Sequence, residues 1–299
     1  MIYTVTFNPA IDYVVTIDNI NKGSVNRLDS EQIYFGGKGI NISLVLKELG
    51  TESTALGFVA GFTGDAIEKE LAAAGVTTDF VRLEKGFSRI NVKIRAEEAT
   101  ELNGSGPEIS DDDVSKLFEK LRRIENGDTI ILAGSVPKSL PRDIYERIIH
   151  FLADKDVRII ADAEKELLLN VLKYKPFLIK PNIQELGGIF GNMPADDDEI
   201  IACASKLREM GAQNVLVSMA GDGAILLDSD GNIRKSGVCR GTVRNSVGAG
   251  DSMIAGFLAG ISDGDFDYAL RLGTAAGGAT AFSEGLAVRE DIFRLIEQL

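Results

Sequence analysis

Short runs of apolar, mostly β-branched residues alternate with segments of helical periodicity along most of the chain. The apolar runs predict strands at residues 2–6, 54–58, 129–132, 157–161, 177–179 and 215–218. Helices are expected at residues 41–49, 64–74, 111–124 and 142–153, with Thr63 and Ser110 as the N-caps of the second and third. Strands that are apolar throughout are typical of a mostly parallel sheet with helices on both faces, so we expect a three-layer α/β/α sandwich. Ligands of such sheets bind at the carboxyl ends of the strands.

Three segments interrupt this alternation. Residues 12–17 and 32–35 are strand-like, and residues 89–95 alternate apolar and polar positions as a half-exposed antiparallel strand does. They predict a small sheet inserted off the main body as a lid, built from segments near 11–35 and 86–106. A hairpin is expected later, between residues 224–227 and 232–235. Because no linker, repeat or low-complexity stretch divides the chain, residues 1–299 are expected to form a single domain that carries the lid.

The composition excludes several kinds of chemistry. The 299 residues include one histidine (His150) and two cysteines (Cys203 and Cys239), which argues against a zinc site and a disulfide scaffold. His150 lies on a predicted helix and is expected to be structural. The net charge of −13 argues against a nucleic-acid partner, whose phosphates need clustered Lys and Arg. No apolar run approaches the roughly 18 residues of a membrane span, so we expect a protein of the reducing cytoplasm with neither nucleic acid nor membrane as partner.

A glycine-rich loop at residues 245–252 opens an apolar helix of small residues. The amides of Gly248, Ala249, Gly250 and Asp251 can converge there on one point, and the helix dipole adds to this hole for an anion. The Asp251 carboxylate is either a helix cap or a general base that takes a proton from an attacking hydroxyl. The loop matches neither the Walker A nor the Rossmann glycine pattern.

A second glycine cluster, residues 36–41, also leads into a predicted helix. Its glycines allow close approach of the backbone to a ligand, and Lys38 and Asn41 can face a polyhydroxy compound; a plain turn is the alternative. Asp12, after the first strand, could accept hydrogen bonds from two sugar hydroxyls.

Four motifs follow one another along the chain: Asn8-Pro9-Ala10-x-Asp12, Gly36-Gly37-Lys38-Gly39-x-Asn41, Lys180-Pro181-Asn182-x-x-Glu185 and Val247-Gly248-Ala249-Gly250-Asp251-Ser252. Together they resemble the ribokinase-like sugar kinases of the phosphofructokinase B family. The resemblance runs over essentially the whole chain and implies a ribokinase-like fold. Segments 88–93, 101–104, 133–137 and 283–286 resemble the branch of that family that phosphorylates ketohexose phosphates.

The resemblance implies ATP-dependent phosphorylation of a ketohexose monophosphate, with fructose 1-phosphate going to fructose 1,6-bisphosphate as the first expectation. Tagatose 6-phosphate and fructose 6-phosphate are alternative acceptors, because a near two-fold axis relates the two primary-alcohol arms of a ketohexofuranose. The non-enzymatic alternative is a catalytically silent sensor, which would bind a sugar phosphate without turnover. In the family, Asp251 would be the base, and the anion hole would be formed by Gly248, Ala249 and Gly250.

Further family roles concern the two substrates. The sugar would be held by Asp12, Gly37, Lys38 and Asn41. Its phosphate would be held by Arg27, Arg89, Asn103 and Ser135. The nucleotide would lie along Lys180, Asn182, Glu185, Ser218, Gly221, Gly223, Ser246 and Ser283. Glu185 would organise Mg²⁺ through water, since Mg²⁺ keeps several waters when bound.

Two segments depart from the family pattern. Asp162-Ala163-Glu164 stands where relatives continue with hydroxyl residues and a glycine. Ala287-Val288 replaces a common Pro-Thr, in a loop that binds a monovalent cation in some relatives, so that cation is left open. Relatives often pair their lids, and pairing would cover the edges of a lid sheet, so a homodimer through the lid is a hypothesis here.

Overall fold

The computed structural model describes residues 1–163, 165–261 and 264–299, and its centre is one large sheet. The strand order is β14-β13-β12-β11-β10-β9-β1-β4-β5, with β6 paired to β4. All of these neighbours run parallel except β12–β13 and β13–β14, which are antiparallel. The strands are β1 (Ile2–Thr6), β4 (Ser53–Ala60), β5 (Thr77–Thr78), β6 (Val81–Leu83), β9 (Thr129–Ala133), β10 (Arg158–Asp162), β11 (Leu178–Ile179), β12 (Asn214–Ser218), β13 (Ala224–Leu227) and β14 (Ile233–Ser236).

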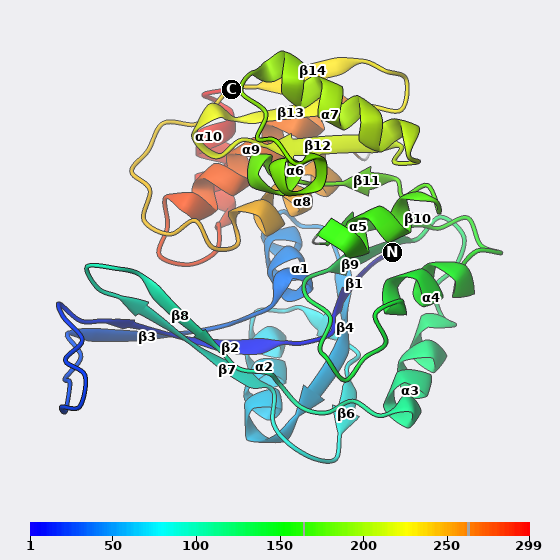
Figure 1. The fold of residues 1–299 in the computed structure, drawn as a ribbon. Coiled ribbons are helices and arrows are strands. Elements are labelled where there is room, and N and C mark those ends of the chain that lie inside the picture. Colours follow the sequence, from blue (N-terminus) through cyan, green and yellow to red (C-terminus); the bar gives the residue numbers. More distant parts are fainter. Residues whose placement is uncertain (164, 262–263) are drawn as a thin grey trace.

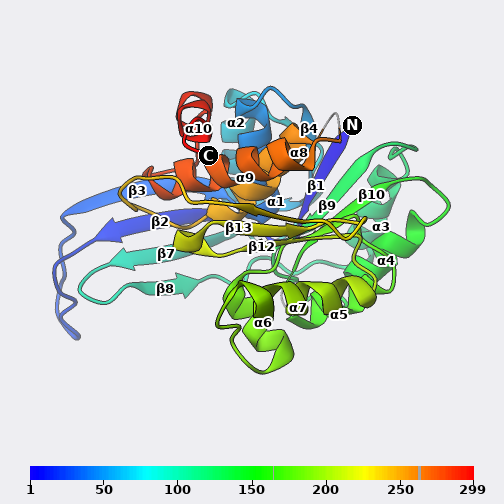
Figure 2. The same ribbon diagram turned by 90° about the horizontal axis from the view of Figure 1, so that it is seen from above.

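Helices cover both faces of this sheet (Figure 2). One layer contains α3 (Asp111–Leu121), α4 (Ile144–Phe151), α5 (Lys165–Leu172), α6 (Ile183–Phe190) and α7 (Asp197–Glu209). The other contains α1 (Lys38–Glu48), α2 (Gly61–Ala73), α8 (Ala249–Gly260), α9 (Phe266–Ala281) and α10 (Arg289–Ile296). The expected three-layer sandwich is confirmed. Within the described ranges, no helix combines the length and apolar character needed to cross a bilayer.

Each continuous apolar run supplies side chains to the cores beneath both helix layers, because side chains alternate between the faces of a strand. Leu132 and Val215 belong to the core beneath α3, α4 and α7, whereas their neighbours Ile131 and Leu216 belong to the core beneath α1, α8 and α9. A strand buried on both faces cannot show the polar alternation of a half-exposed strand. The sequence pattern therefore predicted these strands directly.

The lid is a separate sheet that projects from the body (Figure 1). It contains β2 (Ala10–Thr16), β3 (Ser30–Gly36), β7 (Arg89–Arg95) and β8 (Thr100–Asn103), in the order β3-β2-β7-β8. The prediction that 89–95 is an antiparallel strand is half right: β7 is antiparallel to β8 but parallel to β2. Alternation shows only that one face is covered and says nothing of direction. Strand β8 was not predicted, because all its residues are exposed.

Several helix ends differ from the prediction. Helix α1 begins three residues early because Gly37, with φ of 128°, makes the turn that starts it. Helix α2 begins at Gly61, so Thr63 is not its N-cap; the Thr63 hydroxyl instead donates to the Ser88 carbonyl at 2.7 Å. Ser110 does cap α3, but α3 and α4 are shorter than predicted.

Candidate active site

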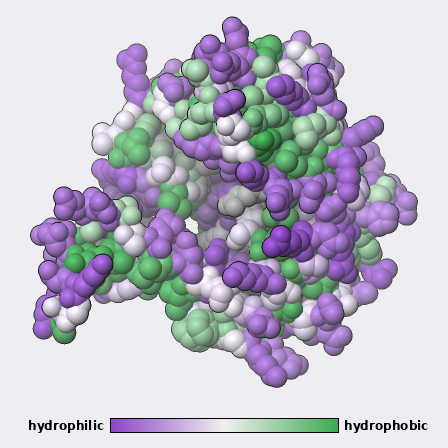
Figure 3. Space-filling model, viewed as in Figure 1, coloured by the Kyte–Doolittle hydropathy of each residue, from purple (hydrophilic) through white to green (hydrophobic). Residues whose placement is uncertain are grey.

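A cavity of about 370 Å³ lies between the lid and the carboxyl edge of the large sheet. In the space-filling view, the surface is hollowed between the lid and the body (Figure 3). Twelve residues singled out from the sequence line this cavity: Asp12, Gly37, Lys38, Asn41, Arg89, Asn103, Lys180, Asn182, Glu185, Gly248, Gly250 and Asp251. They come from the lid sheet, from three helices and from loops at the edge of the large sheet, so the fold brings together motifs that are far apart in sequence.

Asp251 stands in the first turn of α8 with only 5% of its surface exposed. Its Oδ2 accepts a hydrogen bond of 2.8 Å from Nδ2 of Asn41, and α8 has no side-chain cap. The carboxylate is therefore directed at the cavity and does not cap its own helix. Burial, reinforced by the negative charge of Asp162, raises the pKa of Asp251 to about 7, although Lys38, Asn41 and Lys180 oppose the shift. Such a group can accept a proton near neutral pH.

Asp162, at the end of β10, joins two lysines on the floor of the cavity. Lys38 Nζ lies 3.0 Å from Oδ2, and Lys180 Nζ lies 3.5 Å from Oδ1. Burial opposes ionisation of Asp162, but Lys180 and Lys38 outweigh it and hold its pKa below the usual range. Burial also opposes the charge of Lys38, yet Asp162 and Asp251 raise its pKa above the ordinary value. Lys38 is thus kept charged beside the Asp251 carboxylate.

Asp162 is a site residue that the motifs missed. It stood in a segment noted only as a departure from the family pattern, and Glu164 of that segment lies outside the described residues. Its position was nevertheless a signal: a carboxylate that follows a buried parallel strand lies at the ligand-binding edge of the sheet.

The loop at the start of α8 forms part of the expected anion hole. Gly248 has φ of 82°, and neither its amide nor that of Gly250 donates to an acceptor among the described residues. The amide of Ala249 is not free, because it donates to the Ser246 carbonyl at 3.2 Å. A Cβ at Gly250 would lie 2.9 Å from Nζ of Lys180, so the glycine makes room for the ammonium. The Asp251 amide likewise donates to no acceptor among the described residues, so the hole combines three free amides with one lysine.

The lid presents a polar row to the cavity. Asp12, Asn91 and Asn103 stand opposite one another on β2, β7 and β8. Asp12 accepts from Asn91 Nδ2 at 2.7 Å and pairs with Lys93 at 3.0 Å. Arg89 Nε donates to the Asn8 carbonyl at 3.1 Å, and burial lowers the pKa of its guanidinium against the pull of Asp12. The row joins amide donors and cations, which suits a phosphorylated polyhydroxy ligand.

Asn182 and Glu185 form a capping box at the start of α6. The Glu185 amide donates to Oδ1 of Asn182, and the Asn182 amide donates to Oε2 of Glu185, each at 2.8 Å. Oε1 of Glu185, in the wall of the cavity, accepts no hydrogen bond from the described residues. Within the described ranges, no group of three or more His, Cys, Asp and Glu side chains could hold a metal directly. One free carboxylate oxygen fits a magnesium ion held through water.

A second cavity, of about 490 Å³, shares Asn182 and Gly250 with the first. Ser218, Gly221, Gly223 and Ser246, all expected along the nucleotide, line it together with Ala249. The two cavities meet at the anion hole, so an elongated ligand can place its anionic end there.

Three expected residues line neither cavity. Arg27 is exposed on the loop of residues 17–29, and Ser135 is exposed after β9. The Ser283 hydroxyl donates to the Ala279 carbonyl at 2.8 Å, so it is used inside the end of α9.

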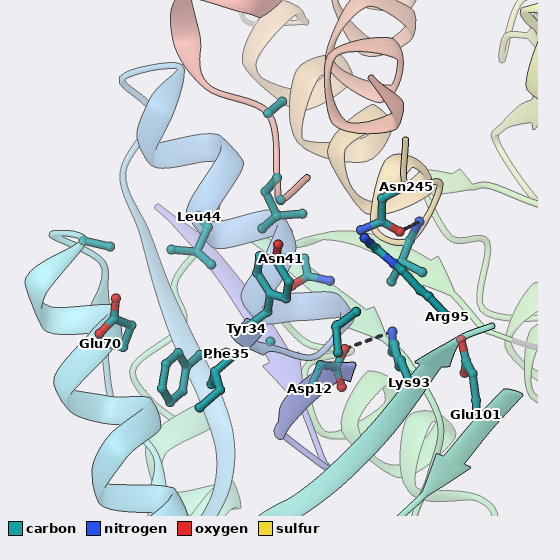
Figure 4. Close-up of a pocket in the computed structure, with 18 of the residues that line it drawn as sticks. Asp12, Tyr34, Phe35, Asn41, Leu44, Glu70, Lys93, Arg95, Glu101 and Asn245 are labelled. Atoms are coloured by element: carbon teal, nitrogen blue, oxygen red, sulfur yellow. Dashed lines mark hydrogen bonds and ion pairs between the residues drawn. The ribbon is translucent and has the colours of Figure 1, made fainter. Parts of the chain in front are cut away.

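A third cavity, of about 520 Å³, opens beside the first between the lid, α1 and α2 (Figure 4). Asp12, Lys93 and Glu101 line both cavities, and Figure 4 shows the Asp12–Lys93 pair at their boundary. The first cavity is therefore open along the lid in a single chain.

Sequence comparison identifies the family. The pattern described as pfkB family carbohydrate kinase matches residues 5–291. The chain belongs to this family. Among pfkB relatives, the 1-phosphofructokinase of Bacillus subtilis (strain 168) is 45% identical over 300 residues, covering 100% of this chain and 98% of the relative. The D-tagatose-1-phosphate kinase of Bacillus licheniformis is 41% identical over 288 residues, covering 96% and 94%.

Solved pfkB structures share the fold. The phosphofructokinase-2 from Escherichia coli in complex with substrates and products superposes with a TM-score of 0.93 at 26% identity, covering 100% of this chain and 99% of that one. A putative phosphofructokinase from Staphylococcus aureus gives 0.88 at 41% identity, covering 100% and 97%. The expected ribokinase-like fold and the expected ATP-dependent sugar-phosphate kinase class are confirmed.

Proposed function

We propose that this pfkB kinase transfers the γ-phosphoryl group of ATP to O6 of fructose 1-phosphate. The observation that carries the proposal is a single cavity in which Asp251 of the body faces Arg89 and Asn103 of the lid. A base lies on one side of the cavity, and groups that can donate hydrogen bonds to a phosphate lie on the other. This arrangement matches a sugar with a hydroxyl at one end and a phosphate at the other. Further support is the 45% identity to a protein named 1-phosphofructokinase.

In the proposed reaction, Asp251 accepts the O6 proton as the bond from O6 to the γ-phosphorus forms. The bond from that phosphorus to the bridging oxygen of ADP breaks, and the proton later leaves Asp251 for solvent. The free amides of Gly248 and Gly250 and the ammonium of Lys180 stabilise the charge on the transferring group. Asp12, Lys38 and Asn41 orient the sugar hydroxyls.

Magnesium belongs to this proposal as the partner of ATP. When bound, it neutralises charge on the nucleotide phosphates. Glu185, through its free Oε1, and Asn182 would hold the ion through water. Whether a monovalent cation also activates the enzyme is a separate measurement, made by comparing potassium with sodium in the assay below.

Support for a homodimer comes from the face of the lid that points away from the cavity. Ile33, Tyr13, Val92 and Leu102 form one cross-strand row, and Ile33 and Leu102 are 56% and 58% exposed. A green area on the lid in Figure 3 shows apolar residues at the surface there. A second copy would cover this row and could receive Arg27 in its cavity. Sedimentation that detects only monomer at micromolar concentration would refute the dimer.

A coupled ADP-release assay tests the function. The acceptors are fructose 1-phosphate, fructose 6-phosphate, tagatose 6-phosphate, D-tagatose 1-phosphate and the free sugars. We expect the highest kcat/KM with fructose 1-phosphate. D-Tagatose 1-phosphate is the second candidate, because it differs only at C4 and a relative of 41% identity bears its name. Binding without ADP release would favour a sugar-phosphate sensor, and turnover of none of the acceptors would refute the kinase proposal.

A further inference from the structure

Lys93 is a lid residue to which the sequence motifs assign no role. It lies on β7 and lines both the first cavity and the lid cavity beside it. Its Nζ lies 3.0 Å from Oδ2 of Asp12, the carboxylate expected to hold the sugar, and Figure 4 marks this pair. The side chains of Lys93 and Asp12 are 16% and 20% exposed. Two charges attract each other more strongly where little water separates them, so this pair is stronger than an ion pair on the open surface.

The register of the lid sheet offers Lys93 a second carboxylate. Lys93 stands directly opposite Val14 on β2 and Glu101 on β8. Asp12 is its diagonal neighbour, two positions along β2 from Val14, and a long side chain can reach across that diagonal. Glu101 is exposed, and no ion pair joins it to Lys93 in the part of the chain that the structure describes. Lys93 therefore pairs with the less exposed of the two carboxylates.

The other oxygen of Asp12 is held as well. Asn91, which is 5% exposed, donates from Nδ2 to Oδ1 of Asp12 at 2.7 Å. Oδ1 of Asn91 accepts from the Gly104 amide at 3.2 Å, so the lid backbone fixes the orientation of the Asn91 side chain. An ionised carboxylate accepts about four hydrogen bonds, two on each oxygen. With Asn91 on one oxygen and Lys93 on the other, each oxygen of Asp12 keeps one free acceptor direction.

Arg89 is a cavity cation with a different kind of partner. Its Nε donates to the Asn8 carbonyl, a neutral group, and its guanidinium forms no ion pair among the described residues. A phosphate is attracted most by a cation whose charge no carboxylate already neutralises. Arg89 is therefore suited to the phosphate of the sugar, whereas the charge of Lys93 is used on Asp12.

We infer that Lys93 is a positioning residue for the sugar, which fixes the Asp12 carboxylate so that its two free acceptor directions meet two neighbouring hydroxyls of the sugar ring. The inference rests on the proposed function. The ring of fructofuranose 1-phosphate carries hydroxyls on C2, C3 and C4, so any two neighbouring ones include the hydroxyl on C3. Without Lys93, the carboxylate loses one of the two contacts that orient it, and its hydrogen bond with that hydroxyl weakens.

The test is the dissociation constant, measured by calorimetry, for fructose 1-phosphate and for 3-deoxyfructose 1-phosphate, which lacks the hydroxyl on C3. Lys93→Met removes the charge and keeps an unbranched side chain beside Val14. It should weaken binding of fructose 1-phosphate by about tenfold or more and binding of the deoxy compound by less than about threefold, because an absent hydrogen bond cannot be lost. Equal weakening of both would mean that Lys93 contacts the phosphate or only supports the lid, and would overturn the inference. No weakening of either would overturn it too.

Two further variants complete the test. Lys93→Arg keeps a cation for Asp12 and should bind fructose 1-phosphate within about fivefold of the wild type; a loss as large as that of Lys93→Met would contradict the inference. Lys116→Met is the matched control, because it breaks an exposed ion pair with Asp113 on α3, and it should change neither constant.

The kinase assay separates this inference from the proposed function. Lys93→Met should raise the KM for fructose 1-phosphate and leave kcat within about threefold, since the hydroxyl on C3 does not react. A fall in kcat with an unchanged KM would contradict the positioning role. A wild type that binds the sugar phosphate but never transfers phosphate would refute the proposed function, and the binding constants would still decide the role of Lys93.

Discussion

Nδ2 of Asn41 donates a hydrogen bond of 2.8 Å to Oδ2 of Asp251 and so joins the first turn of α1 to the first turn of α8. The two residues are 210 positions apart in sequence. One comes from the motif assigned to the sugar and the other from the motif assigned to phosphoryl transfer. Their contact places the proposed base where a sugar hydroxyl would enter.

The first prediction concerns Asp251→Asn. The amide keeps the size of the side chain but cannot take a proton, so kcat should fall by about 10²- to 10⁴-fold. Binding of fructose 1-phosphate, measured by calorimetry, should persist within a few-fold. Unchanged turnover would show that another group acts as the base.

The pH dependence of turnover provides the second prediction. Because the pKa of Asp251 is about 7, kcat/KM should fall as pH drops below 7 and the carboxylate is protonated. Asp162→Asn removes a neighbouring negative charge and frees Lys38 and Lys180 from their ion pairs with Asp162. The midpoint of the kcat/KM profile of this variant should therefore move to lower pH. The phosphate of the sugar titrates equally with both enzymes, so only the difference between the two profiles is interpreted. An identical midpoint would contradict the coupling of the two carboxylates.

Stability should respond to Asp251→Asn in the opposite sense to activity. A carboxyl whose pKa is raised on folding stabilises the protein fully below its unfolded value and loses that contribution as pH rises through 7. The asparagine variant has no carboxyl to ionise, so its stability does not lose this contribution as pH rises. Its melting temperature should therefore exceed that of the wild type at pH 8, by at least about 2 °C, and match it near pH 4. A variant that melts lower at pH 8 would contradict the raised pKa.

Gly250→Ala tests the approach of Lys180 to the anion hole. The new Cβ would lie 2.9 Å from Nζ of Lys180, and the flexible lysine can move away at little cost to folding. We expect a kcat lower by about tenfold or more with little change in melting temperature. Gly188→Ala is the control, since a Cβ there meets nothing within 4 Å. Equal kcat values in the two variants would exclude this role for the lysine.

Arg89→Ala should weaken recognition of the phosphate on the sugar. Charge-assisted hydrogen bonds support a loss in kcat/KM on the order of 10- to 100-fold with fructose 1-phosphate and a much smaller loss with free fructose. Arg82→Ala, which removes an exposed arginine paired with Asp65 and Glu68, serves as the control. An equal loss with both sugars would refute the assignment.

The large sheet and the four motifs could be predicted because each corresponds to a pattern of neighbouring residues in the sequence. Buried parallel strands are continuous apolar runs, and the glycine loops precede helices. The lid was harder: β8 consists of four exposed residues, and the parallel pairing of β2 with β7 leaves no mark in either strand.

The charge network could not be predicted from local patterns. Lys38 and Asp162 are 124 positions apart, and only the order of strands in the sheet brings them together. The motif assigned the hydroxyl of Ser283 to the nucleotide, but Ser283 follows α9 and its hydroxyl donates to a carbonyl in the last turn of that helix. Arg27 lies on an exposed loop. In the proposed homodimer it could contact a substrate that is bound in the cavity of the second copy.

The most direct test of the central claim is the product itself, formed from ATP, Mg²⁺ and fructose 1-phosphate and followed by ³¹P NMR. We predict that a new phosphate monoester appears on C6, in step with ADP, with the wild type and not with Asp251→Asn. Release of inorganic phosphate without a second phosphate on the sugar, or equal product with both enzymes, would contradict the account.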